Sequence, residues 1–266
     1  MTTIGLVRGI IVAASQGNEA GVNDVHQLLR SHRSIRAFVD EPLDDQTVEE
    51  IVRSGLSAAT SSTLQATTVI GVRNRSVREQ IAELAFGQKH IVTAGAFLVW
   101  CADMNRTRRA CEMAGGSMTS GMTEQFIIAT VDVALAAQNA VIAAESQGLG
   151  ICYIGAIRND PQVVSDLLEL PTDVYLVFGL CIGQPTQDPE VKPRLPLGVV
   201  LKDDVYSDEG EAELIEAYDE VVREYYGSWS GGNKDSCWTK EMAGLVDGER
   251  RPHMRQFLAD SGFELR

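Results

Sequence analysis

The sequence predicts a β-sheet covered by helices on both faces, of the α/β or α+β class, and three observations support that prediction. Strand-like and helix-like segments alternate along residues 45–183. The segments 96–104 and 174–183 are apolar throughout, as strands are when both faces of their sheet are buried. The segment 123–148 is apolar almost all round a helix, so we expect it to be buried within the domain or against another subunit.

The composition of the chain is typical of a globular protein that does not bind phosphate-rich surfaces nonspecifically. Of 266 residues, 44% are hydrophobic, which is enough for a substantial core. The formal net charge of −14 argues against nonspecific binding to nucleic acid or to an anionic membrane, because both would repel most of the surface. Five scattered cysteines without a CxxC pair predict reduced core thiols in a cytoplasmic protein.

The first 22 residues predict a flexible tail and no targeting segment. Their apolar run is short, is interrupted by Arg8 and has no basic residue before it, which is not the pattern of a signal peptide. We also expect no run in the chain to approach the length of a membrane span.

The N-terminal half predicts helices and strands in alternation. A short helix is expected from residue 24, and a helix with an acidic start follows Pro42. The β-branched run at 67–74 predicts a strand. The remaining elements expected here are a helix at 76–87, a strand at 96–104 and a polar loop at 104–121.

The C-terminal half begins with the long apolar helix, for which Thr123 is the expected cap and Gly148 the expected stop. Beyond it we expect a strand at 151–155, a helix at 161–170, a strand at 174–183, an extended Pro-rich connection at 184–196, an acidic helix at 211–226, a Gly/Ser loop at 227–238 and an amphipathic helix within 250–266. The part after residue 190 has too few apolar residues to predict a core of its own, so we expect it to wrap the main domain.

Two short cationic segments stand out from the acidic background. "SHRSIR" at 31–36 combines His, Arg and Ser donors that can converge on a phosphate, although a solvated turn would look the same. In "KPRLP" at 192–196, Pro193 favours an extended backbone, so Lys192 and Arg194 would point the same way. A basic linker is the alternative interpretation of that segment.

Several other segments have both a structural and a functional interpretation. In "GLGICYIGA" at 148–156, Gly155 ends a strand where the backbone can approach a flat ligand closely. "ATSSTLQ" at 59–65 and "GQKH" at 87–90 are typical of a polar loop and a helix end. "RTRR" at 106–109 is more typical of a solvated loop than of a phosphate site. The histidines do not have metal-ligand spacing, and no catalytic triad is indicated.

Taken together, these segments resemble the FMN-dependent, oxygen-insensitive nitroreductases, specifically the branch of NADPH nitroreductases and flavin reductase P. The resemblance covers about residues 24–226 and, more loosely, the last helix. It rests on the following segments, in order and spacing: "SHRSIRAFVDEPL", "FGQKH", "CADMNR", "DVALAAQNAVIAAESQGLGICYIGAIRN", "VFGLCIGQP" and "VKPRLP".

The resemblance implies an α+β fold, a mixed sheet flanked by helices, in an intertwined homodimer with FMN at the subunit interface. It implies a core at 23–190 after the tail at 1–22, and a C-terminal excursion at 191–266 that completes the FMN site and the dimer. The helix at 122–147 would then be an element of the dimer core.

The resemblance also implies the residues of the FMN site. His32, Arg33, Ser34, Lys192 and Arg194 would hold the phosphate and the ribityl chain, and Arg36 would lie near the pyrimidine edge of the flavin ring and support the reduced flavin. Gly155, within Tyr153, Ile154, Gly155 and Ala156, would direct its backbone N–H to flavin N5. Thr60, Ser62 and Gln88 would add hydrogen bonds. No metal and no catalytic side chain are implied, because the flavin carries the chemistry.

The implied activity is a two-electron, ping-pong reduction of nitroaromatics, quinones or related flat acceptors by NADPH or NADH. A flavin reductase that supplies reduced FMN, and a non-catalytic flavin-binding sensor, are the alternatives. The nucleotide preference is open, because Gly227, Ser228 and Trp229 follow "EYY" where this branch carries an Arg. Lys234 and the segment 106–109 are possible substitutes. The physiological acceptor is open too, and the loop 111–121 is longer than in the family.

Overall fold

The computed structural model describes residues 24–229 and 234–266, so the predicted tail at 1–22 lies outside the described residues. The described residues divide into two compact units. The larger unit comprises residues 32–189 and 251–266. The smaller unit comprises residues 24–31, 190–229 and 234–250.

The larger unit is built on a four-stranded sheet whose strand order is β1-β2-β4-β3. The strands are β1 (Thr67–Gly71), β2 (Ala96–Asp103), β3 (Gly150–Ile154) and β4 (Val174–Gly183). All three neighbouring pairs are antiparallel. Among the described residues, the parallel component expected of a mixed sheet is a single bridge between Ser34 and Ile151. With helices on both faces, the α+β prediction is confirmed.

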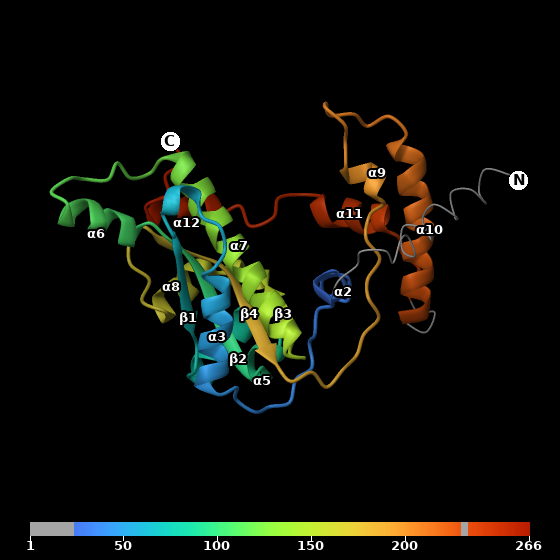
Figure 1. Ribbon diagram of the computed structural model, residues 1–266, viewed down its shortest axis with the longest axis horizontal. Helices are drawn as coiled ribbons and strands as arrows, with labels where there is room; N and C mark the ends of the chain where they lie inside the picture. The colour runs from blue at the N-terminus through green and yellow to red at the C-terminus, as the bar shows by residue number, and fades with distance from the viewer. Residues whose placement is uncertain (1–23, 230–233) are drawn as a thin grey trace, which may run out of the picture. The chain divides into compact units, whose positions relative to one another are not determined.

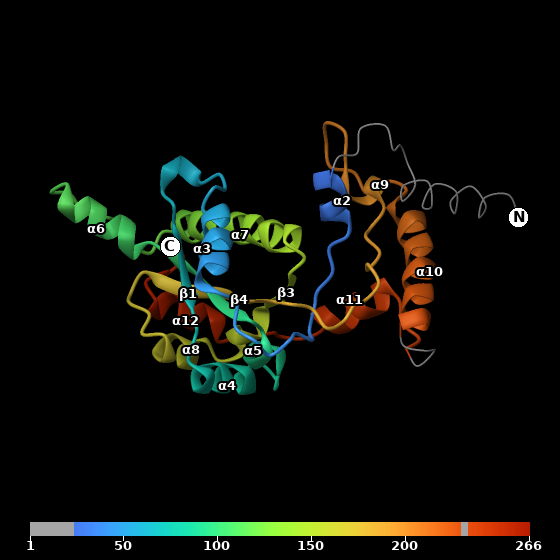
Figure 2. The ribbon, with the colours of Figure 1, turned by 60° about the horizontal axis from the view of Figure 1, so that its bottom comes forward.

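Alternate residues of β2 face two different hydrophobic layers. Leu98 and Trp100 face α3 (Asp45–Gly55) and α7 (Thr123–Ser146), while Phe97 and Val99 face α4 (Arg75–Leu84) and α8 (Pro161–Leu167). α5 (His90–Thr93) lies on the same side as α4. Figures 1 and 2 show the sheet between these two helical layers. The fully apolar strands are therefore central strands with both faces covered, as predicted.

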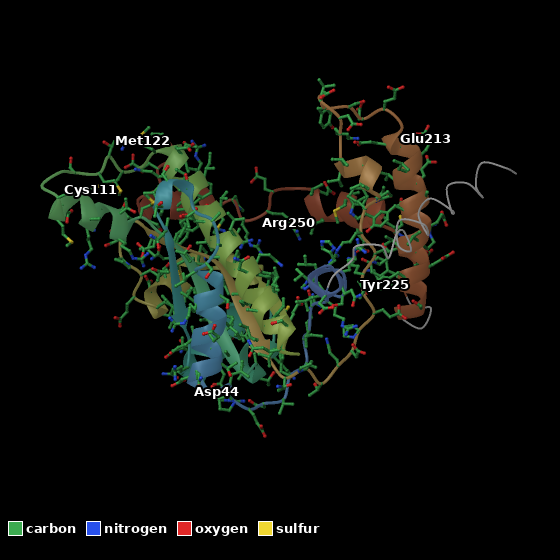
Figure 3. The ribbon with its side chains drawn as sticks, viewed as in Figure 1. Asp44, Cys111, Met122, Glu213, Tyr225 and Arg250 are labelled. Atoms are coloured by element: carbon green, nitrogen blue, oxygen red, sulfur yellow. The ribbon has the colours of Figure 1, made fainter. Side chains whose placement is uncertain are left out.

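Local capping explains where the predicted helices begin. The Asp44 carboxylate accepts a hydrogen bond from Thr47 N at 2.8 Å, and Figure 3 marks Asp44 at the start of α3. Asn74 accepts from Ser76 N at 2.9 Å at the start of α4. α8 begins with Pro161, where a missing backbone N–H costs nothing.

Helix α7 differs from its prediction in its N-cap residue and in its capacity to span a membrane. Its N-cap is Met122, and the hydroxyl of Thr123 instead donates to the C-terminal Arg266 O at 2.9 Å. Its end agrees, because Gly148 has φ 75° just after the last turn. The expectation that no run approaches the length of a membrane span is wrong for α7, whose 24 residues are long and apolar enough to cross a membrane. One face of α7 is buried on the sheet, and this fits a core helix of the larger unit equally well.

The predicted loop at 104–121 contains a helix, α6 (Asn105–Met113), which Figure 3 marks at Cys111. No apolar pattern indicated this helix, because α6 has no buried residue. Two carboxylates hold it, one just before its first turn and one far along the chain. The Asp103 carboxylate accepts from Arg106 N at 3.1 Å, and Arg108 pairs with Asp173 at 2.9 Å.

The last helix, α12 (Met254–Asp260), belongs to the larger unit and completes its core. Phe257 and Leu258 are buried, and the Phe263 ring packs edge-on against Tyr175 with ring centres 4.9 Å apart.

The smaller unit has a core of its own, contrary to the expectation from its composition. Its helices are α2 (Asp24–Arg30), α9 (Leu197–Val200), α10 (Glu211–Trp229) and α11 (Trp238–Val246). The core is a small aromatic cluster around Tyr218, Val222 and Tyr226. Figure 3 marks the neighbouring Tyr225 on α10. α10 runs three residues further than predicted, and α11 was not predicted.

Candidate functional site

The cationic segment 32–36 is fixed against strand β3. Ile35 N donates to Ile151 O at 2.8 Å, and the Ile35 side chain is buried. A Cβ at Gly150 would lie 2.7 Å from Ile35 Cγ1, so only glycine lets segment 32–36 and strand β3 come this close. Because side chains alternate along an extended segment, Ser34 and Arg36 point away from the side that buries Ile35.

His32 is oriented by a carboxylate that the sequence did not indicate. Its Nδ1 lies 2.6 Å from Glu145 Oε1, at the end of α7. The two side chains are 26% and 13% exposed, so the contact is partly shielded from water. With Nδ1 engaged, Nε2 is the ring nitrogen that remains for a ligand.

The two arginines of the segment differ in how they are held. Arg33 pairs with Asp188 at 2.8 Å, and that carboxylate is 81% exposed. Arg36 is exposed, and its hydrogen bond to Ser34 O is long, at 3.5 Å. The positive charge of Arg36 affects the pKa of two neighbouring side chains. Burial, and after it Arg36, lowers the pKa of His90. Burial raises the pKa of Cys152, and Arg36 opposes that rise.

The predicted flavin-ring segment, residues 153–156, comprises the end of β3 and the start of η2 (Gly155–Asn159). Ile154 and Ala156 are buried, so they can offer a ligand only their backbone, whereas Tyr153 and Gly155 are half-buried. The Tyr153 ring packs edge-on against Phe178 at 5.0 Å. Burial, and after it the charge of Glu145, raises the pKa of Tyr153 to about 12, so its phenol is neutral near neutral pH.

Gln88 lies in the turn between α4 and α5, half-buried, and its carbonyl accepts from Ile91 N at 3.0 Å. The preceding Phe86 and Gly87 both have left-handed backbones, with φ 62° and 69°. "GQKH" is therefore not a helix end, because His90 begins α5. His90 is buried, and its Nε2 has no hydrogen-bond partner among the described residues.

Thr60 and Ser62 lie in a loop that is fixed by a buried carboxylate on α7. Asp132, 1% exposed, accepts from Ser61 N at 3.1 Å and from Ala66 N at 3.2 Å. Ser62 belongs to η1 (Ser61–Thr63) and has φ 49°, a left-handed conformation that is costly for a serine. Asp132 was not singled out in the sequence, although a lone acid within "IIATVDVALAA" is a usable signal.

The structure does not bring Thr60 and Ser62 together with His32 in one chain. The loop that contains the first pair is bonded to Asp132 through Ser61 N, and His32 contacts Glu145. Asp132 and Glu145 are thirteen positions apart on α7. At about 1.5 Å per residue, the separation along the helix is about 20 Å. The predicted residues of the larger unit therefore form two groups.

An apolar hollow of about 250 Å³ lies beside the Thr60 loop, along the outer face of α7. Ile127, Val131 and Leu135 on this face are 49%, 49% and 44% exposed. Large apolar side chains in a row on a helix are unusual at a solvent-exposed surface.

Lys192 and Arg194 belong to the smaller unit, and both are exposed. Tyr218 donates its hydroxyl to Pro193 O at 2.9 Å, which fixes the backbone between them. Lys192 Nζ lies 5.4 Å from the centre of the Tyr226 ring. Across residues 24–229 and 234–266, Arg194 makes no side-chain hydrogen bond and no ion pair.

Lys234 and Arg106, two of the possible substitutes for the missing arginine, already have protein partners. Lys234 Nζ lies 4.0 Å from the centre of the Tyr226 ring and 3.1 Å from Glu241. In the "RTRR" segment, Arg106 donates to Gln65 O and Thr67 O.

Comparison with known protein families gives matches over most of the chain. The model of the "Nitroreductase family" matches residues 29–184, and that of the "Nitroreductase family, C-terminal domain" matches residues 192–266.

Individual proteins are similar over almost their whole length. An oxygen-insensitive NADPH nitroreductase of Salmonella typhimurium is 40% identical over 90% of this chain and 98% of its own. A Cr(VI) reductase of Pseudomonas sp. is 40% identical over the same shares. The structure of the NADPH:FMN oxidoreductase of Vibrio harveyi complexed with NAD+ superimposes with a TM-score of 0.84 at 36% identity, covering 92% of this chain and all of that one.

Proposed function

The chain belongs to the nitroreductase family, and on that premise we propose that it is an FMN-dependent NAD(P)H oxidoreductase that reduces nitroaromatics, quinones or related flat acceptors by two electrons. The relatives that support this activity are named for NADPH, FMN and nitro compounds. Within the chain, the observation that carries the proposal is the cationic segment 32–36, held in a fixed conformation against β3.

The residues of this segment fit the phosphate end of FMN. His32 Nε2, the Ser34 hydroxyl and the Arg33 guanidinium are donors on one short extended segment, and charge-assisted hydrogen bonds to phosphate are strong. Gly150 and the Ile35 backbone hold the segment in place before a ligand binds, which reduces the ordering cost of binding.

The residues near the end of β3 fit the flavin ring. FMN, when bound, supplies the two-electron chemistry between NAD(P)H and the acceptor. Arg36 offers an exposed cation for the pyrimidine edge, where it would stabilise negative charge. Gly155 offers its N–H without a side chain in the way, and Tyr153 borders the site as a neutral phenol. Gln88 adds a side-chain amide, and Ile154 and Ala156 contribute backbone only.

We assign Lys192 and Arg194 to the phosphate and ribityl chain as part of the same proposal. Their support is the match of "KPRLP" to the family pattern, together with the absence of any partner for Arg194 in the described part of the chain. A guanidinium without a protein partner has its full hydrogen-bonding capacity left for a ligand.

The proposed enzyme is a homodimer in which the second copy covers the outer face of α7. The apolar hollow beside α7 supports this, because exposed Ile, Val and Leu in a row gain from burial. The separation of about 20 Å along α7 supports it as well. The Thr60 and Ser62 loop of one copy would then serve the FMN bound at His32 of the other.

We propose that either NADPH or NADH serves as donor, and that the enzyme acts in the cytoplasm. No arginine follows Tyr226, since Gly227 and Ser228 take its place, and Ser228 donates to Tyr225 O at 2.9 Å. The five cysteines are free thiols, as suits a reducing compartment.

Anaerobic stopped-flow absorbance of the FMN-loaded protein, mixed separately with NADPH and NADH, tests the proposed function. We expect rapid bleaching of the bound flavin and its recovery on adding nitrofurazone or a quinone. Faster turnover of free FMN than of nitro compounds would make the enzyme a flavin reductase, as the name of the Vibrio relative suggests. Bound flavin that neither nucleotide bleaches would replace the enzyme with a sensor.

A further inference from the structure

Glu145 places a negative charge inside a site that is built to bind an anion. Its side chain is 13% exposed, and its carboxylate lies 2.6 Å from His32 Nδ1. His32 is itself one of the proposed phosphate donors, together with Ser34 two residues later. A carboxylate beside a phosphate costs energy through repulsion between like charges. Glu145 is also in the last turn of α7, where the helix dipole disfavours an anion. Both costs call for a compensating role.

The geometry of the imidazole limits what that role can be. An ionised carboxylate only accepts hydrogen bonds, so the 2.6 Å contact requires a proton on His32 Nδ1. A phosphate oxygen likewise only accepts, so a bond from Nε2 to FMN requires a proton on that nitrogen too. A neutral imidazole has one such proton, and the two acceptors together need two.

We propose that Glu145 is a positioning residue that holds His32 as a doubly protonated imidazolium between its own carboxylate and the FMN phosphate. This inference rests on the proposed function, because it takes the ligand at Nε2 to be that phosphate. The charge of Glu145 is then neutralised by the imidazolium, and the phosphate meets a cation whose ring plane is already fixed. Carboxylate partners orient histidine rings at metal sites by the same physical effect.

The surroundings of His32 support this role for Glu145 over a general structural one. Segment 32–36 is already held by the backbone bonds of Ile35 and by the close approach at Gly150, so it does not need Glu145 for its position. What the backbone leaves undetermined is the rotation of the His32 ring, and the 2.6 Å contact determines it.

The test uses nitrogen-15 NMR of the histidine rings in the FMN-loaded protein near neutral pH. The chain has four histidines, so His32→Asn assigns the His32 signals by their loss. We expect both His32 ring nitrogens to carry protons in the wild type. In Glu145→Gln we expect one proton only, and FMN affinity about tenfold weaker, the scale of a hydrogen bond to a charged group.

Two variants keep the result interpretable. Glu145→Asp retains the charge and should retain the doubly protonated pattern, and Glu124→Gln makes the same chemical change at the exposed start of α7 and should change neither readout. A singly protonated His32 in the wild-type complex, or an unchanged ring in Glu145→Gln, overturns the inference.

Failure of the underlying site would look different. If His32→Asn binds FMN as tightly as the wild type, the phosphate assignment of His32 fails, whatever the NMR of Glu145→Gln shows. If His32→Asn loses affinity while Glu145→Gln does not, the phosphate site stands and only the role of Glu145 is wrong.

Discussion

The two cationic segments of this chain, 32–36 and 192–196, have similar compositions but differ in how the protein holds them. In the first, His32 and Arg33 each contact a carboxylate, and the backbone pairs with β3. In the second, Tyr218 fixes the backbone at Pro193, while Arg194 has no side-chain partner in the described part of the chain. The first segment is therefore fixed and its charge partly neutralised, and the second presents its charge to solvent.

This difference separates two contributions to anion binding. A fixed segment lowers the entropy cost of binding, but its carboxylates compete with the ligand for the same donors. An arginine without a protein partner breaks no protein contact when a ligand binds, so the net energy of its bonds to the ligand, after loss of its hydration, contributes to affinity alone. We therefore expect substitutions in 32–36 to change stability and FMN affinity together, and substitutions in 192–196 to change affinity alone.

Arg194→Ala is the substitution with the largest expected effect on affinity. It should weaken FMN binding by about 1.5–3 kcal/mol, the scale of a hydrogen bond to a charged group, and leave the urea unfolding midpoint unchanged, because Arg194 has no side-chain partner to lose among the described residues. Quenching of flavin fluorescence measures the affinity. Lys240→Ala removes the same charge from the exposed face of α11 and serves as the control. Unchanged flavin retention in Arg194→Ala would remove this residue from the site.

Gly150→Ala tests the fixed segment through its backbone. The added methyl group would lie 2.7 Å from Ile35 Cγ1, and overpacking of this kind costs about 1–3 kcal/mol. The free energy of unfolding and the FMN affinity should therefore both fall. Gly71→Ala is the matched control in β1 of the same sheet, because its methyl group would have 3.8 Å to the nearest side chain. Loss of stability with full FMN affinity would show that the position of the segment does not matter for binding.

The sequence allowed correct predictions where a feature depends only on residues a few positions apart. The strands β2 and β4, the end of α7 at Gly148 and the helix α4 follow from apolar patterns and caps within a few residues. The two cationic segments were found because their charge differs from the acidic background. Such features need no knowledge of which segments meet in space.

Most of the features that were missed depend on contacts between residues far apart in the sequence. Helix α6 has no apolar face and is held by Asp103 and Asp173. Asp132 and Glu145 acquire their roles from a loop 66 positions away and from a histidine 113 positions away. The aromatic core of the smaller unit forms because Tyr218, Val222 and Tyr226 recur at helical spacing, a pattern that the low overall apolar content concealed.

Alkaline pH gives a prediction that compares the tyrosines next to the two segments. Burial, and after it Glu145, raises the pKa of Tyr153 to about 12, and burial also raises the pKa of Tyr218, an effect that Arg194 opposes. Tyrosines in the unfolded chain titrate at about 10. The folded state thus keeps both protons longer than the unfolded chain does. The contribution of Tyr153 to stability is complete below about pH 10 and is lost as the pH rises through about 12, and that of Tyr218 changes in the same direction.

Absorbance of tyrosinate during alkaline titration, followed together with circular dichroism, measures both effects. Tyr153→Phe should make the larger unit less sensitive to alkaline pH, and it should remove a late-titrating group from the absorbance curve. If Tyr153 ionises together with the exposed tyrosines while the fold is intact, Tyr153 is not shielded from water at its position next to Glu145.

Asp188→Asn has the smallest expected effect on FMN affinity. The sign of that effect shows whether the carboxylates beside segment 32–36 compete with the ligand or orient its donors. Asp188 competes with a ligand for Arg33, but it is 81% exposed, and exposed ion pairs contribute only about 0–1 kcal/mol. Removing its charge should therefore tighten FMN binding by a few-fold at most, and less at high salt because exposed charges are screened. Asp45→Asn disrupts a similar exposed pair, with Arg73 at 2.7 Å, and should leave FMN affinity unchanged. If Asp188→Asn instead weakens FMN binding, Asp188 holds Arg33 in its binding geometry, and the carboxylates of segment 32–36 act as orienting groups and not as competitors.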